Sequence, residues 1–445
     1  MKSQFSRRDF LRRATLTAAG LWAAPYVTSG LRAASPNGLV LHASIGASGQ
    51  AADDIRGITG APAVRLLAVA DVDLTHTAAV KQKFPDVKVY QDWRELLDKE
   101  KSIDSVNVTV PDHMHAAIAM SALQRGKSVY CQKPLTHDLY EARRLTEFAR
   151  KNRLVTQMGI QIHSSGVYQQ AVRIIQDGTI GKVKEVHAWS EKKWGDESPR
   201  PDRSDPVPAG FNWDWWLGTA VARPFIGGGY YHPGEWRKRL DFGTGTFGDM
   251  GCHIYDPPFN ALALTAPVSV HSEGPAPNQW NWAVNAVIHY LFPGTQYTAE
   301  QTVPVTWYDG DERPPKEVQA LLGGDSLPGQ GSLFIGTKGV MLLPHIGSAQ
   351  LYPEKDFDGF KRPKVEEHDH WQQFVEAVRG NGRTSASFDY AGPLSETVLL
   401  GSVACRFPKT TLEWNAQALR FTNVREANRY VRRTYRHGWE VKGLS

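Results

Sequence analysis

Short apolar runs alternate with helix-compatible segments along the first third of the chain. The runs occupy residues 39–46, 64–73, 105–110, 128–131 and 154–159, and segments such as 115–126 and 137–152 between them have helical composition. A strand followed by a helix about every 25 to 30 residues predicts a parallel, doubly wound sheet. We therefore expect a Rossmann-type, dinucleotide-binding domain over residues 37–160.

The turn after the first run is the expected phosphate-binding segment. Residues 46–51 read GASGQA, which keeps the first glycine of a G-x-G-x-x-G turn but has Ser48 and Ala51 in place of the second and third. On its own this turn is a weak signal, and a plain β-turn would account for it. In the predicted sheet we expect cofactor contacts from Gly46, Ser48, Gly49 and Gln50.

An acidic residue strengthens the cofactor prediction. Asp71 ends the second apolar run, where a carboxylate can accept hydrogen bonds from the adenosine ribose hydroxyls. A carboxylate there repels a 2′-phosphate, so we expect NAD rather than NADP. Asp73 either shares this role or caps the following helix, and we favour capping.

The N-terminus resembles a twin-arginine export signal. Arg7 and Arg8 lie in SRRDFLRR, and the apolar run 14–27 is shorter than the roughly 18 to 20 residues of a membrane span. We expect a signal peptide over residues 1–34, the twin-arginine export machinery as a partner and a periplasmic or otherwise exported protein. An uncleaved signal that anchors the protein, and an ordinary basic tail, stay open as alternatives.

Charge and cysteine usage exclude several classes of function. The net charge of +5 resides in residues 1–34, so the rest of the chain is balanced and we expect no nucleic-acid partner. The three cysteines are far apart and indicate neither a disulfide framework nor a metal site. His113 and His115 stand two residues apart without an evident third ligand, so we predict no metal site.

Two further motifs carry reactive side chains. VYCQKPLT, residues 129–136, places Lys133 at the carboxyl end of a strand, although a solvated loop lysine is the alternative. In GDMGCH, a helix that begins near Asp249 would direct Asp249 and His253 to one cleft, because residues four apart share a helix face. A capping aspartate and a core histidine are the alternative for this pair.

These motifs, together with VPDHMH (110–115), MGIQIHS (158–164) and residues 370–406, resemble the Gfo/Idh/MocA family of nicotinamide-dependent sugar and cyclitol oxidoreductases. The resemblance implies that an α/β domain with a large, mostly antiparallel open sheet follows over residues 161–445, binds substrate and builds a dimer or tetramer. The E-K-P motif of the family appears here as Gln132-Lys133-Pro134. This departure from glutamate puts the grip on the cofactor in doubt.

The resemblance also assigns roles by position. It implies that Lys133, Asp249 and His253 are catalytic, with His253 as the first choice for proton transfer. The further cofactor contacts that it implies are Val110, Pro111, His115, Gln132, Lys133 and Gln161. For the carbohydrate substrate we expect His163, Trp236 and Arg237, the last two in the Gly- and Pro-rich segment 195–246. In the same segment we expect WDWWLG, with Trp213, Trp215 and Trp216, mainly to hold the loop onto the domain.

The expected function is an exported oxidoreductase that acts on a sugar, glycoside or cyclitol with tightly bound NAD. A redox-neutral enzyme that cleaves or epimerises a glycoside through a keto sugar would use the same residues. A non-catalytic sugar-binding protein is the third reading, favoured by Ser48, Ala51 and Gln132.

Overall fold

The structure is a computed structural model that describes residues 38–445. The predicted signal peptide, residues 1–34, lies outside the described residues. Among residues 38–445, no helix is both long enough and apolar enough to cross a bilayer.

The first sheet has six parallel strands in the order β3-β2-β1-β4-β5-β6. This is the strand order of the Rossmann fold, and the order reverses between β1 and β4. The strands are β1 (Val40–Ile45), β2 (Val64–Ala70), β3 (Lys88–Tyr90), β4 (Ser105–Val108), β5 (Ser128–Gln132) and β6 (Thr156–Gly159). The five expected strands are all present. The sequence analysis missed β3, because an edge strand of three residues leaves no apolar run.

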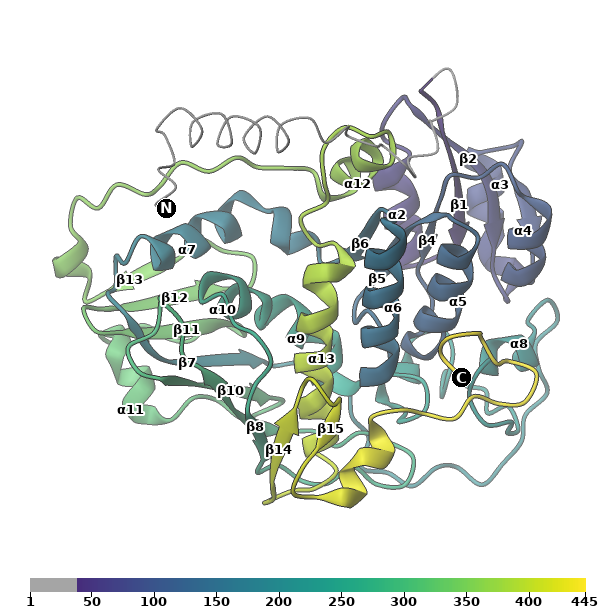
Figure 1. Ribbon diagram of the computed structural model, residues 1–445. Coiled ribbons are helices and arrows are strands. Elements are labelled where there is room, and N and C mark those ends of the chain that lie inside the picture. Colours follow the sequence, from purple (N-terminus) through teal and green to yellow (C-terminus); the bar gives the residue numbers. More distant parts are fainter. Residues whose placement is uncertain (1–37) are drawn as a thin grey trace, which may run out of the picture. The chain divides into compact units, whose positions relative to one another are not determined.

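Helices cover this sheet on the surfaces that its strands bury. All four residues of β4 are buried, as expected for a parallel sheet between helical layers. The helices are α2 (Gln50–Ile58), α3 (Ala78–Lys83), α4 (Trp93–Lys99), α5 (Asp112–Gln124) and α6 (Leu139–Asn152). A capping box of Asp138 and Glu141 starts α6, which lies beside α5 (Figure 1).

The second sheet has nine strands in the order β13-β12-β11-β7-β10-β9-β8-β14-β15. Only β7 and β10 pair in parallel, so the predicted large, mostly antiparallel sheet is confirmed. Its strands are β7 (Val183–Ser190), β8 (Ser269–Ser272), β9 (Val287–Pro293), β10 (Thr302–Asp309), β11 (Gln330–Gly336), β12 (Val340–Pro344), β13 (Gln350–Tyr352), β14 (Thr411–Asn415) and β15 (Arg420–Phe421).

The later helices join the two sheets through one continuous apolar core. Buried residues of this core run from Ile45 in β1 through Met250 in α9 to Trp307 in β10. Helix α12 returns to pack on α2, and α13 packs along α6 (Figure 1). The helices are α7 (Gly166–Gln176), α8 (Trp213–Leu217), α9 (Gly245–Ile254), α10 (Asp256–Ala261), α11 (Lys316–Gln319), α12 (His370–Val378) and α13 (Phe388–Ala404).

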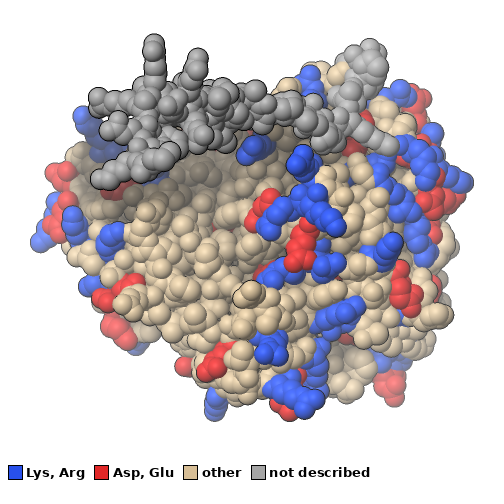
Figure 2. All heavy atoms as spheres, viewed as in Figure 1, with Lys and Arg blue, Asp and Glu red and all other residues tan. Residues whose placement is uncertain are grey.

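Charged groups pair both on the surface and at the junction of α6 and α13. On the face of residues 38–445 drawn in Figure 2, basic and acidic side chains are intermixed rather than separated by sign. Two arginines of α6 reach α13. Arg143 binds Glu396 through two 2.7 Å hydrogen bonds, and the Glu396 side chain is 9% exposed. Arg150 binds Asp389 at 2.7 Å, and both of these side chains are more than half exposed.

We expect the two ion pairs between α6 and α13 to contribute differently to the free energy of unfolding. Arg143→Ala leaves a buried carboxylate without its cation, so we expect the free energy of unfolding to fall by about 3 kcal/mol. Arg150→Ala is the matched control and should cost no more than about 0.5 kcal/mol, because water screens an exposed pair. Urea unfolding of both variants measures the difference. Equal losses would contradict the assignment of Arg143 as the buried link.

Candidate active site

A cavity of about 280 Å³ lies along the carboxyl ends of β1, β2, β4 and β5, where the strand order reverses. Ligands of open α/β sheets bind at this point. Most of the sequence-predicted residues line it. They are Gly46, Ser48, Gly49, Gln50, Asp71, Val110, Pro111, His115, Gln132, Lys133, Trp236 and Arg237.

The turn after β1 has a backbone that requires glycine. Gly46 has φ of 108°, and a Cβ at this position would lie 2.1 Å from the carbonyl oxygen of Thr109. Gly49, with φ of 57°, precedes the first turn of α2. Gly46 and Gly49 therefore leave the backbone at the start of the nine-residue helix α2 free of side chains, so that a pyrophosphate can approach it. Ser48 and Ala51 stand where the motif has its other two glycines.

Asp71 connects the turn after β1 with the end of β2. Its carboxylate accepts hydrogen bonds from the backbone N–H groups of Ala47 and Asp73, each at 3.0 Å, and the residue lines the cavity. Asp73 accepts from the N–H of Thr75 at the start of the 3₁₀ helix Leu74–Thr77, which confirms the predicted cap. The carboxylate at the end of β2 and the glycine turn together fit a dinucleotide with a free ribose 2′-hydroxyl.

Gln132, the departure from the family motif, binds a buried carboxylate. Its amide nitrogen donates to both oxygens of Asp54 in α2, at 3.1 and 2.9 Å. The indole of Trp371 in α12 donates to Asp54 at 2.9 Å and the hydroxyl of Thr109 donates at 2.8 Å. Burial raises the pKa of Asp54, and these hydrogen bonds partly offset that effect. Asp54 thus holds the end of β5, α2 and α12 together.

Lys133 points from the end of β5 to α9. Its Nζ donates to the Asp249 carboxylate at 2.6 Å and to the Asp249 carbonyl oxygen at 2.8 Å. Both side chains are largely buried, with 13% and 8% exposed. A buried ion pair with two hydrogen bonds fixes the position of Nζ more tightly than a surface pair does. The solvated loop lysine that the sequence left open is therefore excluded.

Asp249 is the centre of a cationic cluster. Trp194 donates its indole N–H to the carboxylate at 2.8 Å, and Lys192 and Arg237 each lie 3.4 Å from it. Burial alone would raise the pKa of Asp249, but the charges of Lys133, Arg237 and Lys192 outweigh burial and hold this pKa far below its ordinary value. Asp249 is thus ionised and acts as an acceptor.

Helix α9 begins at Gly245, one turn before Asp249, so Asp249 is not a helix cap. His253 lies on α9 one turn further on, beside a separate hollow that Tyr168 and His345 also line. Its ring centroid is 5.4 Å from that of His345. Burial, and then the charge of Lys133, lowers the pKa of His253 well below its ordinary value. Its buried Nδ1 finds no hydrogen-bond partner among residues 38–445.

Two further predicted residues make contacts outside the lining of the large cavity. Gln161 donates to the hydroxyl of Tyr130 at 3.2 Å. His163 is buried and its Nδ1 lies 2.8 Å from the carboxylate of Asp256, which also accepts a hydrogen bond from the hydroxyl of Tyr390. Neither residue lines the cavity of Lys133 and Asp71 in this conformation.

The segment after β7, residues 195–246, folds back over the first sheet and is called the covering segment. The backbone N–H of Asn212 donates to the carbonyl of Val72 at 2.9 Å, and the N–H of Leu74 donates to the carbonyl of Gly210 at 3.0 Å. Trp213 and Trp216 stack with centroids 4.9 Å apart inside an aromatic cluster, which agrees with the predicted anchoring role. The segment also forms one wall of the large cavity through Trp215, Trp216, His232, Pro233, Trp236 and Arg237.

Asp112 is a titratable group of the cavity that the sequence analysis did not single out. Asp112, the first residue of α5, lines the cavity and accepts a hydrogen bond from Thr244 at 2.7 Å. Burial raises the pKa of Asp112 to about 7, although Arg237 and Lys133 lie close enough to lower it. A carboxyl that titrates near neutrality in a cleft is a candidate for proton transfer. Its position after Pro111 in VPDHMH was the available signal.

The contacts of Gln132 predict the effect of restoring the family glutamate. Gln132→Glu would bring two carboxylates together in the interior, so we expect the free energy of unfolding at pH 7 to fall by about 2 kcal/mol or more. The loss should shrink towards pH 5, because one carboxyl then binds a proton. Adding Asp54→Asn should recover most of the loss, and urea unfolding of the single and double variants tests both statements. A neutral Gln132→Glu, or no recovery in the double variant, would contradict this account.

Solved structures with the same fold cover most of this chain. The WlbA dehydrogenase of Bordetella pertussis, in complex with NADH and UDP-GlcNAcA, superposes with a TM-score of 0.60 and 13% identity over 85% of this chain and 99% of that chain. GenD2 from gentamicin A biosynthesis, in complex with NAD, gives a TM-score of 0.56 and 17% identity over 85% of this chain and 97% of that chain.

Curated relatives match less than half of the chain. Levoglucosan dehydrogenase of Pseudarthrobacter phenanthrenivorans is 25% identical over 44% of this chain and 41% of its own length. Inositol 2-dehydrogenase of Salmonella typhimurium is 31% identical over 28% of this chain and 37% of its own length. The matched segments thus span about two fifths of these relatives.

Two family models match nearly all of the described chain. The oxidoreductase family with an NAD-binding Rossmann fold matches residues 42–160, and the C-terminal alpha/beta domain of the same oxidoreductase family matches residues 169–441. The glycine turn, Asp71, and the paired Lys133 and Asp249 lie within these ranges. This chain belongs to the Gfo/Idh/MocA family of oxidoreductases.

Proposed function

We propose that this protein is an exported, NAD-dependent oxidoreductase that acts on a sugar, a glycoside or a cyclitol and retains its cofactor. The observation that carries the proposal is that Lys133, held by Asp249, lines the same cavity as Asp71 and the glycine turn. A proton-transfer group and a dinucleotide-binding turn therefore serve one ligand space. The similarity to levoglucosan dehydrogenase and inositol 2-dehydrogenase supports a carbohydrate or cyclitol substrate.

Bound NAD would supply a hydride acceptor for the oxidation of a secondary alcohol. The residues of this chain would hold it by the turn at Gly46, by Asp71 and by the end of β5. Lys133 exchanges the hydroxyl proton, and Asp249 fixes its Nζ at 2.6 Å. His253 stays in the proposal as a further proton-transfer group, one turn from Asp249 on α9, although it lines a separate hollow rather than the cavity of Lys133.

The substrate end of the proposed site is aromatic and cationic. Arg237 stacks on Trp236 with 4.3 Å from the guanidinium carbon to the ring centroid, and both residues line the cavity. Aromatic faces pack on the C–H faces of sugars, and guanidinium groups donate to hydroxyls. Asp112, with a pKa of about 7, lies beside this pair and can exchange a second proton.

Cofactor retention connects this site with the proposed export. The segment after β7 covers part of the cavity from outside the first sheet, so a bound dinucleotide would be enclosed between two parts of the chain. Export by the twin-arginine machinery to the periplasm would suit a protein that folds around NAD in the cytoplasm. The proposal also includes a homo-oligomer, a dimer or a tetramer, and it keeps an uncleaved, anchoring signal as the alternative to a cleaved one.

The first prediction from this proposal concerns cofactor content. The full chain purified from its exported location should release about one NAD(H) per chain on denaturation, since the covering segment slows dissociation. Chromatography of the released nucleotides measures this ratio. Protein that releases no nicotinamide and binds no added NAD would refute the proposed function.

A second prediction concerns Lys133. Lys133→Met should lower turnover by about 100-fold or more, because proton transfer commonly contributes 10²- to 10⁴-fold, while the NAD content stays unchanged. Lys193→Met is the matched control, since Lys193 is half exposed and pairs with Asp311. Turnover with glycosides and cyclitols, read as NADH formed against bond cleaved, also separates net oxidation from redox-neutral cleavage. Full activity of Lys133→Met would contradict the assigned role.

A further inference from the structure

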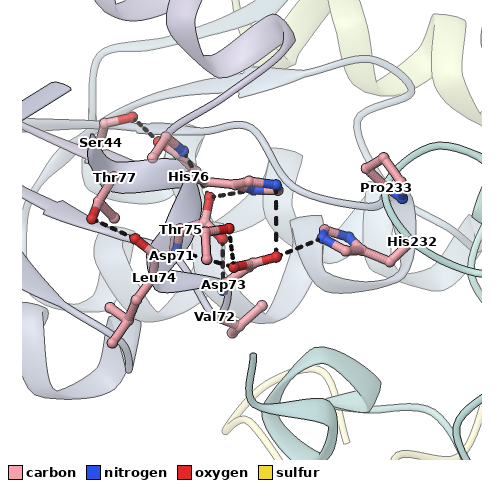
Figure 3. Close-up of polar contacts among 12 residues, drawn as sticks. Ser44, Asp71, Val72, Asp73, Leu74, Thr75, His76, Thr77, His232 and Pro233 are labelled. Carbon is pink, nitrogen blue, oxygen red and sulfur yellow. Dashed lines mark hydrogen bonds and ion pairs between the residues drawn. The ribbon is translucent and has the colours of Figure 1, made fainter. Parts of the chain in front are cut away.

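Two histidines and an aspartate from distant parts of the chain meet beside Asp71. Asp73 and His76 follow β2, whereas His232 belongs to the segment that covers the cavity. The Oδ2 atom of Asp73 lies 3.2 Å from Nε2 of His232 and 3.7 Å from Nε2 of His76. Figure 3 shows the Asp73 carboxylate between the two imidazole rings. Each of the three residues offers one ligand atom, and these atoms lie within 4.8 Å of one another.

The spacing of these atoms resembles that of a tetrahedral metal site. Zinc binds histidine nitrogen and carboxylate oxygen at about 2.0 to 2.2 Å, so neighbouring ligand atoms of a tetrahedral site lie about 3.3 Å apart. The distances from Asp73 Oδ2 to the Nε2 atoms of His232 and His76, 3.2 and 3.7 Å, lie just below and just above this value. The other oxygen of Asp73 is already used, because Oδ1 accepts from the N–H and hydroxyl of Thr75. Oδ2 is thus the oxygen available to a cation.

The neighbouring groups orient both rings. His76 turns Nδ1 towards Asp71, with 3.5 Å between Nδ1 and Oδ2, and therefore presents Nε2 to Asp73. Carboxylates commonly hold metal-binding histidines in this way. The ring of His232 stacks on Phe211 at 4.8 Å and 14°, which directs its Nε2 towards Asp73. The three side chains are 13% to 23% exposed, so an ion from solvent can reach them.

We propose that Asp73, His76 and His232 form a site for a divalent transition-metal ion, with zinc favoured by two imidazoles and one carboxylate. The fourth position would face the cavity that His76 and His232 line. The ion would join the end of β2 to the covering segment, so it would fasten that segment beside Asp71. This site departs from the sequence expectation of no metal, and it does not depend on the reaction proposed for Lys133.

The test uses the full chain, stripped with a chelator and titrated with Zn²⁺ and with Co²⁺. We expect one bound ion per chain and visible Co²⁺ absorption bands typical of tetrahedral coordination. His76→Ala and His232→Ala should each weaken binding at least about tenfold. Loss of a residue that only hydrogen-bonds a metal ligand already costs about tenfold or more, and these variants remove a ligand itself. His437→Ala is the matched control, because it removes an exposed histidine that pairs with Glu440, and it should leave affinity unchanged.

Conservative changes separate loss of ligands from loss of folding. Asp73→Asn keeps the shape and the Thr75 contacts but should weaken Zn²⁺ binding, and Zn²⁺ should raise the melting temperature of the parent protein more than that of this variant. The proposal is overturned if the parent protein binds no Zn²⁺ or Co²⁺. It is also overturned if His76→Ala, His232→Ala and the control bind equally well, which would leave a hydrogen-bonded cluster without an ion.

Discussion

The ion pair between Lys133 and Asp249 is the contact on which the site depends. It joins the end of β5 in the first sheet to α9, the helix that packs against the second sheet. Without Asp249, Lys133 would be a largely buried charge with no carboxylate partner, so the end of β5 cannot shift away from α9 without a large cost. Arg237 and Trp194 reach the same carboxylate and carry this constraint into the segment around the cavity. The carboxylate of Asp249 therefore fixes how the end of β5 lies relative to α9 and to the segment around the cavity.

The second organising group is the carboxylate of Asp54, and it explains the unusual motif. A glutamate at position 132 would meet a buried carboxylate that already serves Trp371 and Thr109, whereas the amide of Gln132 donates to it. The carboxyl group beside the cofactor end of β5 is therefore that of Asp54 on α2. A degenerate site would be expected to lose such contacts, so Gln132 does not by itself favour a non-catalytic protein. Its neighbour Lys133 keeps the ion pair with Asp249.

Features that depend on residues close together in the sequence could be predicted, whereas contacts between distant residues could not. The alternating runs predicted the parallel sheet, since each strand and helix is encoded locally, and Asp71 could be placed because it ends a strand. The three-residue strand β3 carried too few residues for a pattern. The partnership of Asp54 with Trp371 joins residues 317 positions apart, and no local periodicity encodes it.

The same reason explains how the histidines were treated. His113 and His115 attracted attention as neighbours in sequence, yet burial in α5 gives them backbone partners: His113 contacts the Trp216 carbonyl and His115 the Val110 and Pro134 carbonyls. Neither His76 nor His232 was considered as a metal ligand, although the fold brings their rings to 5.1 Å. Spacing along the chain indicates a ligand set only when one element carries it. A set divided between the end of β2 and the covering segment can be recognised only in the folded chain. An ion bound by such a set would also hold the covering segment in place.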